Sequence, residues 1–340
     1  MANYVAAIRR ATLEASRIHR DMAIQAQVVH GTGRIDVYST IARLGVPLFF
    51  TKLDGLLGAY YRHPSPGVLV TTERPLNQQR FTAAHELGHH WLGHTPSLDD
   101  EESMLRRAPF QAIKGDDVQE VEAETFAAAF LLPRWLVDRH CEQQEWTDAD
   151  LLDPTRVYQL ALRVGISFKA AVWTLARYDV FDRKIAAAMA DIELKKIKKQ
   201  LLRGYEPKSY KGDVWVVSER DAHMRIDGGP NDLFVVGLAE HSGSGYLWRI
   251  ESIDGEALAV VADAREDIDA EGIGGSTMRL ITTAAQDRRL GELRLAESRP
   301  WQLANPRNTF ALQYNLTGAE QQGWYKDQRK QHHQALLKAA

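Results

Sequence analysis

The N-terminal half of the chain places its apolar residues at helical intervals. Residues 2–27 are predicted to form a first helix, because four apolar side chains recur at this spacing. They are Val5, Ile8, Leu13 and Ile18. Three short β-branched or aromatic runs, VPLFF, LLGAYYR and GVLVTT, predict a small sheet. Further helices are predicted in DVYSTIARLG, FTAAHELGHHWLG, DVQEVEAETFAAAFLLP, RVYQLALRVG, SFKAAVWTLARY and FDRKIAAAMADIELKKIKKQLL.

The pattern changes after residues 203–212, RGYEPKSYKG, whose glycine, proline and charged residues are typical of a linker. Beyond this segment, seven runs bounded by turn residues predict strands. They are DVWVVSE, DLFVVGLAE, GYLWRI, ALAVVAD, TMRLITTA, GELRLAES and TFALQYNL. Their spacing favours an all-β sandwich or barrel. The fold class expected for the whole chain is therefore α+β, with a helical domain that carries a small sheet followed by an all-β domain.

The composition narrows the classes of protein to consider. The 340 residues exceed what one core usually supports, so two domains are expected. A net charge of -3 provides no overall basic field, and the basic segment ELKKIKKQLLR is typical of a solvated face, so direct nucleic-acid binding is not expected. The single cysteine, Cys141, cannot form an intramolecular disulfide. With neither a signal-peptide pattern nor a membrane-spanning stretch in the sequence, a cytoplasmic protein that does not bind a membrane is expected.

Residues 80–94, RFTAAHELGHHWLGH, contain the pattern H-E-x-x-H at His85, Glu86 and His89. Two residues four apart lie on one face of a helix, so both imidazoles can reach one metal ion. A zinc hydrolase also needs a third protein ligand and an open position for water, and Glu86 is placed to act as general base. A solvated helix rich in histidine is the alternative. The small and apolar residues before His85, together with Gly88, favour a buried helix and the metal site.

Two further histidines are expected to lie outside the metal site. His90 follows about 100° round the helix from His89, and His94 falls nearly opposite His85. The extended pattern that uses a third histidine as ligand fails here by one residue. A surface or helix-end role is therefore predicted for both His90 and His94.

A third ligand is expected from the helix that contains QEVEAETFAAAFLLP. Glu120 shares a helical stripe with small or apolar residues that would let this helix pack closely against the first one. They are Ala123, Ala127 and Phe130. Glu124 is the alternative ligand or an outer partner of the site, whereas Glu122 falls on a different face. A purely structural role for Glu120 stays open, because Asp117 and Glu120 also fit a capping box.

The segments RFTAAHELGHHWLGH and EVEAETFAAAFLLP together resemble the ImmA/IrrE family of zinc metallopeptidases, whose second helix reads E-x-x-A-x-x-F-A-x-x-L-L-x-P. The resemblance covers roughly residues 35–185, and a phenylalanine occupies one of the leucine positions. It implies a zincin-like domain with one zinc ion, held by His85, His89 and Glu120. It also implies that Glu86 is the general base. Members of this family are cytoplasmic and cleave transcriptional repressors in stress response or mobile-element control, so a helix-turn-helix repressor is the implied substrate.

Three stretches of the second half, HSGSGYLW, GIGG and RPW, resemble in order and spacing the loop motifs of chagasin-like inhibitors of papain-type cysteine peptidases. This resemblance implies an immunoglobulin-like β-sandwich with a partner-binding end. The loop residues carried over are Ser244, Gly245, Tyr246, Gly272, Gly274, Gly275, Arg299, Pro300 and Trp301. The first loop departs from the family, because residues 240–244 replace the segment that enters the target's cleft. Trp248 completes the first motif, and a core role is an equal alternative for it.

The predicted organisation is a metallopeptidase domain at residues 1–202, a linker at 203–213, a β-sandwich at 214–316 and a polar C-terminal helix or tail at 317–340. Two classes of function remain open. One is a zinc endopeptidase that cuts a regulatory protein, with the β domain holding the substrate or a second protein partner. The other is a non-catalytic, metal-dependent sensor or binding protein. Glu86 favours the enzyme, because a binding scaffold needs no general base.

Overall fold

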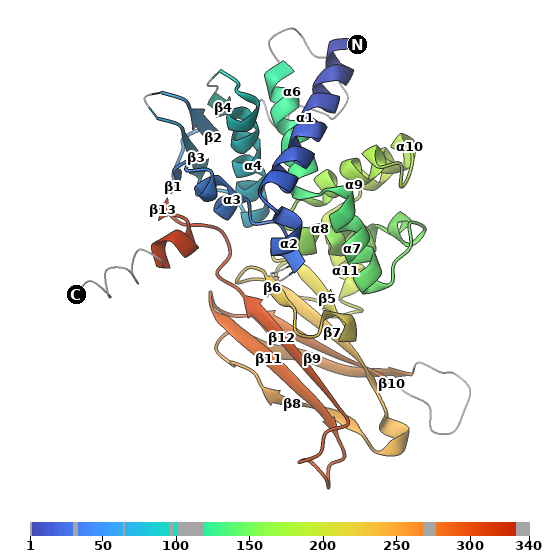
Figure 1. The fold of residues 1–340 in the computed structure, drawn as a ribbon. Coiled ribbons are helices and arrows are strands. Elements are labelled where there is room, and N and C mark those ends of the chain that lie inside the picture. Colours follow the sequence, from blue (N-terminus) through green and yellow to red (C-terminus); the bar gives the residue numbers. More distant parts are fainter. Residues whose placement is uncertain are drawn as a thin grey trace, which may run out of the picture. The chain divides into compact units, whose positions relative to one another are not determined.

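The computed structural model describes residues 2–29, 33–63, 65–95, 98–100, 118–267 and 277–330. The chain separates into two compact units, whose elements are drawn in Figure 1. Unit 1 comprises Met1–Cys141, Leu160–Ala190 and Ala319–Ala340. Unit 2 comprises Glu142–Gln159 and Asp191–Gly318. The α+β organisation expected from the sequence is confirmed, with a helical region that carries a small sheet followed by a region of strands.

Unit 1 contains a five-stranded sheet in the order β13-β1-β3-β2-β4. Its strands are β1 (Leu48–Thr51), β2 (Leu56–Tyr61), β3 (Gly67–Thr71), β4 (Leu98–Asp100) and β13 (Gly323–Trp324). Strands β1 and β3 are parallel, and the other neighbours are antiparallel. The predicted runs VPLFF, LLGAYYR and GVLVTT supply the first three strands, so the small sheet of the sequence prediction is present.

Helices form much of the core of unit 1, and those at residues 37–43 and 76–92 pack against this sheet. The described helices of this unit are α1 (Ala2–Asp21), α2 (Ile24–Val29), α3 (Val37–Arg43), α4 (Leu76–Leu92), α6 (Val118–Leu131), α7 (Arg134–Gln144), α9 (Phe168–Arg177) and α10 (Arg183–Ala190). Helix α6 packs against both α1 and α4 (Figure 1). Almost its whole circumference is buried, including the side chains of Glu120 and Glu122. The single helix predicted over residues 2–27 is instead two, because the chain turns at Ala23, whose φ is 49°.

The last described segment of the chain belongs to unit 1 rather than to the sandwich that precedes it. Strand β13 pairs with the edge strand β1, opposite Phe49 and Phe50. The buried amide of Gln79 accepts a hydrogen bond from the backbone N–H of Glu320 at 2.7 Å and donates to its carbonyl at 3.1 Å. Within the segment predicted as a polar helix or tail, residues 323–324 form this strand and residues 326–330 are helical, with residues 331–340 outside the described part.

Unit 2 is a sandwich of two four-stranded sheets, in the orders β5-β7-β10-β9 and β6-β12-β11-β8. The first sheet contains β5 (Val214–Val217), β7 (Leu233–Glu240), β9 (Leu258–Asp267) and β10 (Thr277–Ala285). The second contains β6 (Arg225–Asp227), β8 (Leu247–Ser252), β11 (Leu290–Ser298) and β12 (Asn308–Asn315). Alternate residues of β12, Phe310, Leu312 and Tyr314, are buried, as a strand with one face toward a core requires. All seven predicted strands occur, and the short β6 is an addition.

The two compact units interleave along the sequence and do not divide it at one position. Part of α8 (Pro154–Val164) and all of α11 (Leu194–Leu201) belong to unit 2, as does the short 3₁₀ helix at Asp150–Leu152. The Gln159 side chain donates to the Val214 carbonyl at 2.7 Å and accepts from the Val216 N–H at 2.9 Å. It therefore satisfies backbone groups of β5 in the way that a neighbouring strand would. These helices were assigned to the first domain because periodicity does not show which core a helix packs against. Within the described part of the chain, no helix combines the length and apolarity required to cross a membrane.

Candidate metal centre

Helix α4 directs two imidazoles to the same point. His85 and His89 lie one turn apart and are almost fully buried, with 1% and 0% of their surface exposed. Their Nε2 atoms are 3.0 Å apart. The helix ends at Leu92 because Gly93 adopts the left-handed conformation, with φ 72°. The two histidines singled out by their spacing therefore face one position.

A carboxylate from α6 meets both imidazoles. Glu120 Oε2 lies 3.2 Å from His85 Nε2, and Oε1 lies 3.5 Å from His89 Nε2. One ligand atom from each of the three side chains falls within 4.8 Å of the others. Burial alone would raise the pKa of Glu120, but hydrogen bonds and charge from His85 and His89 outweigh it and hold that pKa well below its usual range. The carboxylate is therefore ionised when it faces the two rings.

The close approach of α4 and α6 depends on a residue without a side chain. A Cβ atom placed on Gly88 would lie 3.1 Å from Ala123 Cα and 3.2 Å from Phe126 Cδ1. The sequence indicated that Gly88 favours a buried helix, and the structure shows that the backbone of α6 lies against it. This contact brings Glu120 within reach of the histidines.

The donor set fits zinc. Two imidazole nitrogens and one carboxylate are the protein ligands that catalytic zinc sites use, with the remaining position left for water. In the residues that the structure describes, this is the one group of three histidine or carboxylate side chains whose ligand atoms converge. The residues present therefore match the ion that the sequence resemblance implies.

Glu86 lies on a different face of α4, toward strand β2. Its surface is 1% exposed. A Cβ atom on Gly58 of β2 would lie 2.5 Å from Glu86 Oε1 and 2.5 Å from Thr82 Cγ2, closer than atoms can approach. The absence of a side chain at Gly58 therefore makes the space that the Glu86 carboxylate occupies.

His90 follows Glu86 by four residues, so it shares the face of α4 that meets β2. Its Nδ1 lies 3.3 Å from the hydroxyl of Tyr60, which is two residues beyond Gly58 on the same side of the strand. Burial lowers the pKa of His90. His90 is thus half-buried beside the general-base candidate and lies in the last turn of α4, where a surface or helix-end role was predicted.

The predicted helix-end position of His94 is confirmed, and the alternative of a surface role is wrong. His94 follows the end of α4, but it is 4% exposed and its Nδ1 lies 3.0 Å from Nδ1 of the ligand candidate His89. Its Nε2 lies 2.9 Å from Glu122 Oε2, and Glu122 also binds Arg10. The sequence carried one signal for this arrangement, because a glycine at the helix end lets the next residue turn back toward the helix.

Glu124, the alternative ligand, is half-buried and does not belong to the convergent group among the described residues. The competing structural role of Glu120 depends on Asp117, which lies outside the described residues. Of the three glutamates considered on this helix, Glu120 contacts the ring nitrogens of His85 and His89. Glu122 instead forms a hydrogen bond with His94.

The first and last of the predicted loops meet at one end of the sandwich. Gly245 has φ 78°, and a Cβ atom there would lie 3.1 Å from Cη2 of Trp301. The Arg299 side chain donates to the Ser244 carbonyl at 3.2 Å, and its guanidinium lies 4.6 Å from the centre of the Tyr246 ring. Trp301, which follows the exposed Pro300, is itself 73% exposed. The predicted glycines of the middle loop, Gly272, Gly274 and Gly275, lie outside the described residues.

Trp248 and Trp301 have different environments. Trp248 is 4% exposed, and its indole N–H donates to the Ala239 carbonyl at 2.8 Å. The nearby Glu240 is fully buried, accepts from the Trp248 backbone N–H at 3.2 Å and pairs with Arg265 at 2.7 Å. The alternative of a core role therefore holds for Trp248, and Trp301 is the tryptophan presented to solvent.

Residues 41–175 match the family model described as Peptidase_M78, IrrE N-terminal-like domain. This match includes α4 and α6 and so contains the whole convergent group. It supports a peptidase, and it confirms the family resemblance of the N-terminal part. No curated protein matches the chain.

Three solved structures resemble part of the chain. The cysteine protease inhibitor EhICP2 from Entamoeba histolytica is 18% identical, with a TM-score of 0.29, and the match covers 32% of this chain and 99% of that one. Amebosin is 20% identical, with a TM-score of 0.27, covering 31% and 97%. PbICP-C, solved in complex with falcipain-2, is 11% identical, with a TM-score of 0.24, covering 33% and 97%.

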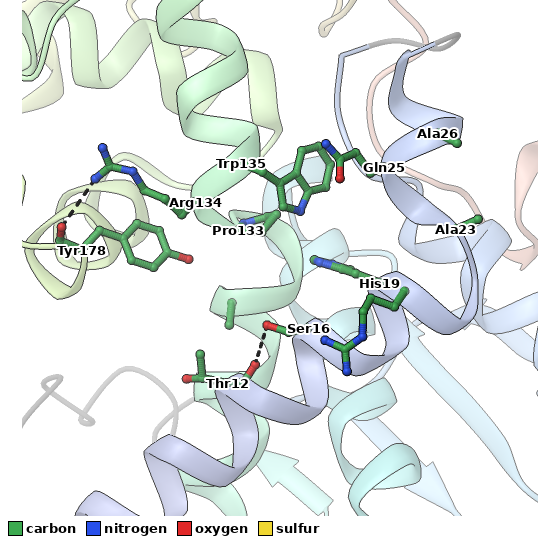
Figure 2. A pocket seen from close by; sticks show the side chains of 12 residues that line it. Thr12, Ser16, His19, Ala23, Gln25, Ala26, Pro133, Arg134, Trp135 and Tyr178 are labelled. Atoms are coloured by element: carbon green, nitrogen blue, oxygen red, sulfur yellow. Dashed lines mark hydrogen bonds between the residues drawn. The ribbon is translucent and has the colours of Figure 1, made fainter.

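A cavity of about 780 Å³ lies elsewhere in unit 1 (Figure 2). Its lining comes partly from α1 and α2, outside the residues that match the IrrE N-terminal-like family, and partly from α6, α7 and Tyr178. His19 and Trp135 face each other across this lining, with ring centres 6.0 Å apart. None of the three convergent side chains lines it, so the cavity is separate from the candidate metal centre.

Proposed function

We propose that this protein is a zinc-dependent endopeptidase that hydrolyses a peptide bond in a regulatory protein. The observation that carries the proposal is the convergence of His85, His89 and Glu120 within 4.8 Å, beside a buried glutamate on the same helix. The family match over residues 41–175 supports a peptidase independently of this geometry. A metal-dependent sensor would need the three ligands but not Glu86.

A bound zinc ion supplies Lewis acidity, which polarises the scissile carbonyl and lowers the pKa of bound water toward about 7. Glu86 is proposed to accept the proton of the attacking water and to return it to the leaving amine. Its position between α4 and the side-chain-free Gly58 holds the carboxylate in one place. His85, His89 and Glu120 hold the ion without taking part in proton transfer.

We further assign the substrate class as a transcriptional repressor, on the resemblance of the metal-binding helices to a family that cleaves such proteins. A cytoplasmic location accords with this assignment. The loop end of the sandwich is proposed to hold the substrate or a second protein. Exposed tryptophan and arginine side chains, which Trp301 and Arg299 supply there, are typical of sites that dominate protein binding.

The test exchanges Glu86 for glutamine in the full chain. Glu86→Gln keeps the size of the side chain but cannot accept the proton, so we expect full zinc content with peptide cleavage reduced by at least about 100-fold, the lower end of general acid–base contributions. Cleavage of a purified helix-turn-helix repressor is followed by mass spectrometry. Glu73→Gln is the matched control, because Glu73 is half-exposed and pairs with Lys52.

Two results would contradict the proposal. If Glu86→Gln cuts as fast as the parent, Glu86 is not the base. If the parent binds zinc but cuts neither the repressor nor any protein in a total-protein digest, the alternative of a metal-dependent sensor replaces the enzyme.

A further inference from the structure

A continuous chain of hydrogen bonds connects the N-terminal helix α1 to a proposed metal ligand. Arg10 Nη1 donates to both oxygens of Glu122, at 2.9 and 3.1 Å. Glu122 Oε2 lies 2.9 Å from His94 Nε2, and His94 Nδ1 lies 3.0 Å from His89 Nδ1. Four side chains from α1, α6, α4 and the residue after its C-cap therefore form one relay, which ends on the ring nitrogen of His89 that faces away from Glu120.

The donors and acceptors of this relay determine which nitrogen of His89 carries its proton. The carboxylate of Glu122 can only accept, so Nε2 of His94 donates to it. The Nδ1 atom of a neutral His94 is then an acceptor, and Nδ1–H of His89 donates to that atom. His89 Nε2 is left without a proton, and its lone pair points to the position shared with His85 and Glu120. This is the form of imidazole that binds a metal ion.

The same arginine also determines where His94 lies. Arg10 Nη2 donates to the carbonyl of Leu92, the last residue of α4, at 3.1 Å. Gly93 then turns the chain, and the N–H of His94 binds the His89 carbonyl at 3.0 Å. The two imidazole rings come to rest with their centres 5.0 Å apart. Arg10 thus holds both the end of α4 and the carboxylate that His94 contacts.

Arg10 lies outside the residues that match the IrrE N-terminal-like family, which begin at position 41. We propose that Arg10, Glu122 and His94 are positioning residues for the metal site, and that helix α1 is therefore a working part of that site. Their hydrogen bonds reach His89 at Nδ1, the ring nitrogen that faces away from Glu120, and so orient the ring and fix its tautomer. This inference rests on the proposed metallopeptidase function, because it concerns the ligand that binds the ion.

The test measures metal affinity rather than cleavage. Zn²⁺ affinity of the full chain is measured by competition with a chelator, and the absorption spectrum of the Co²⁺-substituted protein reports the coordination geometry. Loss of an outer hydrogen-bond partner typically lowers metal affinity about 10–100-fold, so we expect His94→Gln to fall in this range and Arg10→Gln near its lower end. Arg10→Lys, which keeps the charge, should recover part of the loss.

Arg9→Gln is the matched control, because Arg9 is the exposed neighbour of Arg10 on the same helix. Its Zn²⁺ affinity and Co²⁺ spectrum should equal those of the parent. Metal-free Arg10→Gln should melt close to the parent, because the Arg10 side chain is 53% exposed. This variant keeps the test decisive even if the buried His94→Gln does not fold.

The outcomes separate this inference from the proposed function. If the parent binds Zn²⁺ and Arg10→Gln and His94→Gln bind it equally well with unchanged Co²⁺ spectra, the relay does not position the ligand, and the metallopeptidase assignment stands. If the parent binds neither metal ion, the proposed function fails and the inference fails with it. A combined Arg10→Gln and His94→Gln variant that loses no more affinity than His94→Gln alone would support a single relay.

Discussion

The metal centre of unit 1 and the loop end of the sandwich in unit 2 present their chemical groups in opposite ways. At the metal centre, the side chains of His85 and His89 are buried and their ring nitrogens converge. At the loop end, Trp301 is largely exposed, and its ring lies close to the backbone of Gly245. Chemistry on a small ion needs ligands held in a dry, fixed geometry, whereas recognition of a protein needs apolar surface that a partner can cover.

The two regions are therefore recognised by different observations. The metal centre is recognised by the distances between titratable groups, which have a narrow range if one ion is to be bound. The loop end is recognised only by exposed aromatic and arginine side chains, which do not specify a partner. A substitution in one region should therefore leave the readout of the other unchanged, as the comparison of His85→Ala with Trp301→Ala tests directly.

The largest expected effect is the loss of metal from His85→Ala. Removing a ligand should lower Zn²⁺ affinity by more than the roughly 100-fold that marks the upper range for an outer partner. Metal content after desalting, measured by mass spectrometry, tests this. Trp301→Ala is the comparison variant from the sandwich, and it should retain one metal ion per chain. Equal metal content in His85→Ala and the parent would remove His85 from the site.

The next effect distinguishes the two tryptophans of the sandwich. Trp248→Ala removes a buried ring and should lower the free energy of unfolding by about 3–5 kcal/mol. Trp301→Ala removes an exposed ring and should change it by no more than about 0.5 kcal/mol. Urea denaturation of both variants gives the measurement. A Trp301→Ala variant as unstable as Trp248→Ala would show that Trp301 braces the loops instead of forming a contact surface.

A third prediction concerns pH and the cavity region of unit 1. Burial lowers the pKa of His19 to about 4, against a smaller opposing effect of its hydrogen bond to the Phe130 carbonyl. Between about pH 6.5 and 4 the unfolded chain binds a proton at this position and the folded chain does not, so stability falls as the pH falls through this range. The shift corresponds to about 3 kcal/mol.

His19→Gln can keep a hydrogen-bond donor but does not titrate, so the variant should lose less stability than the parent between pH 7 and pH 4. Denaturant unfolding of unit 1 at both pH values provides the comparison. The metal centre is not part of this effect, so the measurement is made on metal-free protein. Identical pH dependence in parent and variant would show that His19 protonates without unfolding.

The smallest expected effect concerns the position of the Glu86 carboxylate. Gly58→Ala places a methyl group 2.5 Å from Glu86 Oε1 and 2.5 Å from Thr82 Cγ2, so both side chains must move. A displacement of about 1 Å can lower a turnover rate about 100-fold, and we expect kcat to fall by up to that factor while zinc content stays unchanged. Gly67→Ala on the neighbouring strand is the control, because its nearest atom would be 3.9 Å away. Unchanged kcat in Gly58→Ala would show that Glu86 needs no fixed position.

Local patterns predicted most of the secondary structure of this chain. The apolar runs of the second half correspond to the seven main strands, because alternation along a strand is a property of adjacent residues. The prediction was less accurate where the backbone turns within a helical pattern. FDRKIAAAMADIELKKIKKQLL forms two helices, α10 and α11, which pack in different units. A periodic pattern carries no information on which of two cores a helix joins.

Strand β13 was missed for a related reason. Its two residues, Gly323 and Trp324, are too few to show any alternation, and they form a strand only because the edge of β1 is there to pair with them. The same holds for β6, which pairs with β12 across a long separation in sequence. Pairings of this kind arise from the assembled sheet, since a short segment has no stable extended form by itself.

The sequence by itself determined that His85 and His89 face one way on a helix with Glu86 beside them, because spacing within a helix is a local property. It also indicated the glutamates from which a third ligand would come. Only the tertiary structure decided that Glu120 contacts both histidines. It also decided that Arg10, Glu122 and His94 form a chain of hydrogen bonds to Nδ1 of His89. Those contacts require three separate segments to pack together, and packing at Gly88 and Ala123 depends on the shapes of both helices rather than on either sequence alone.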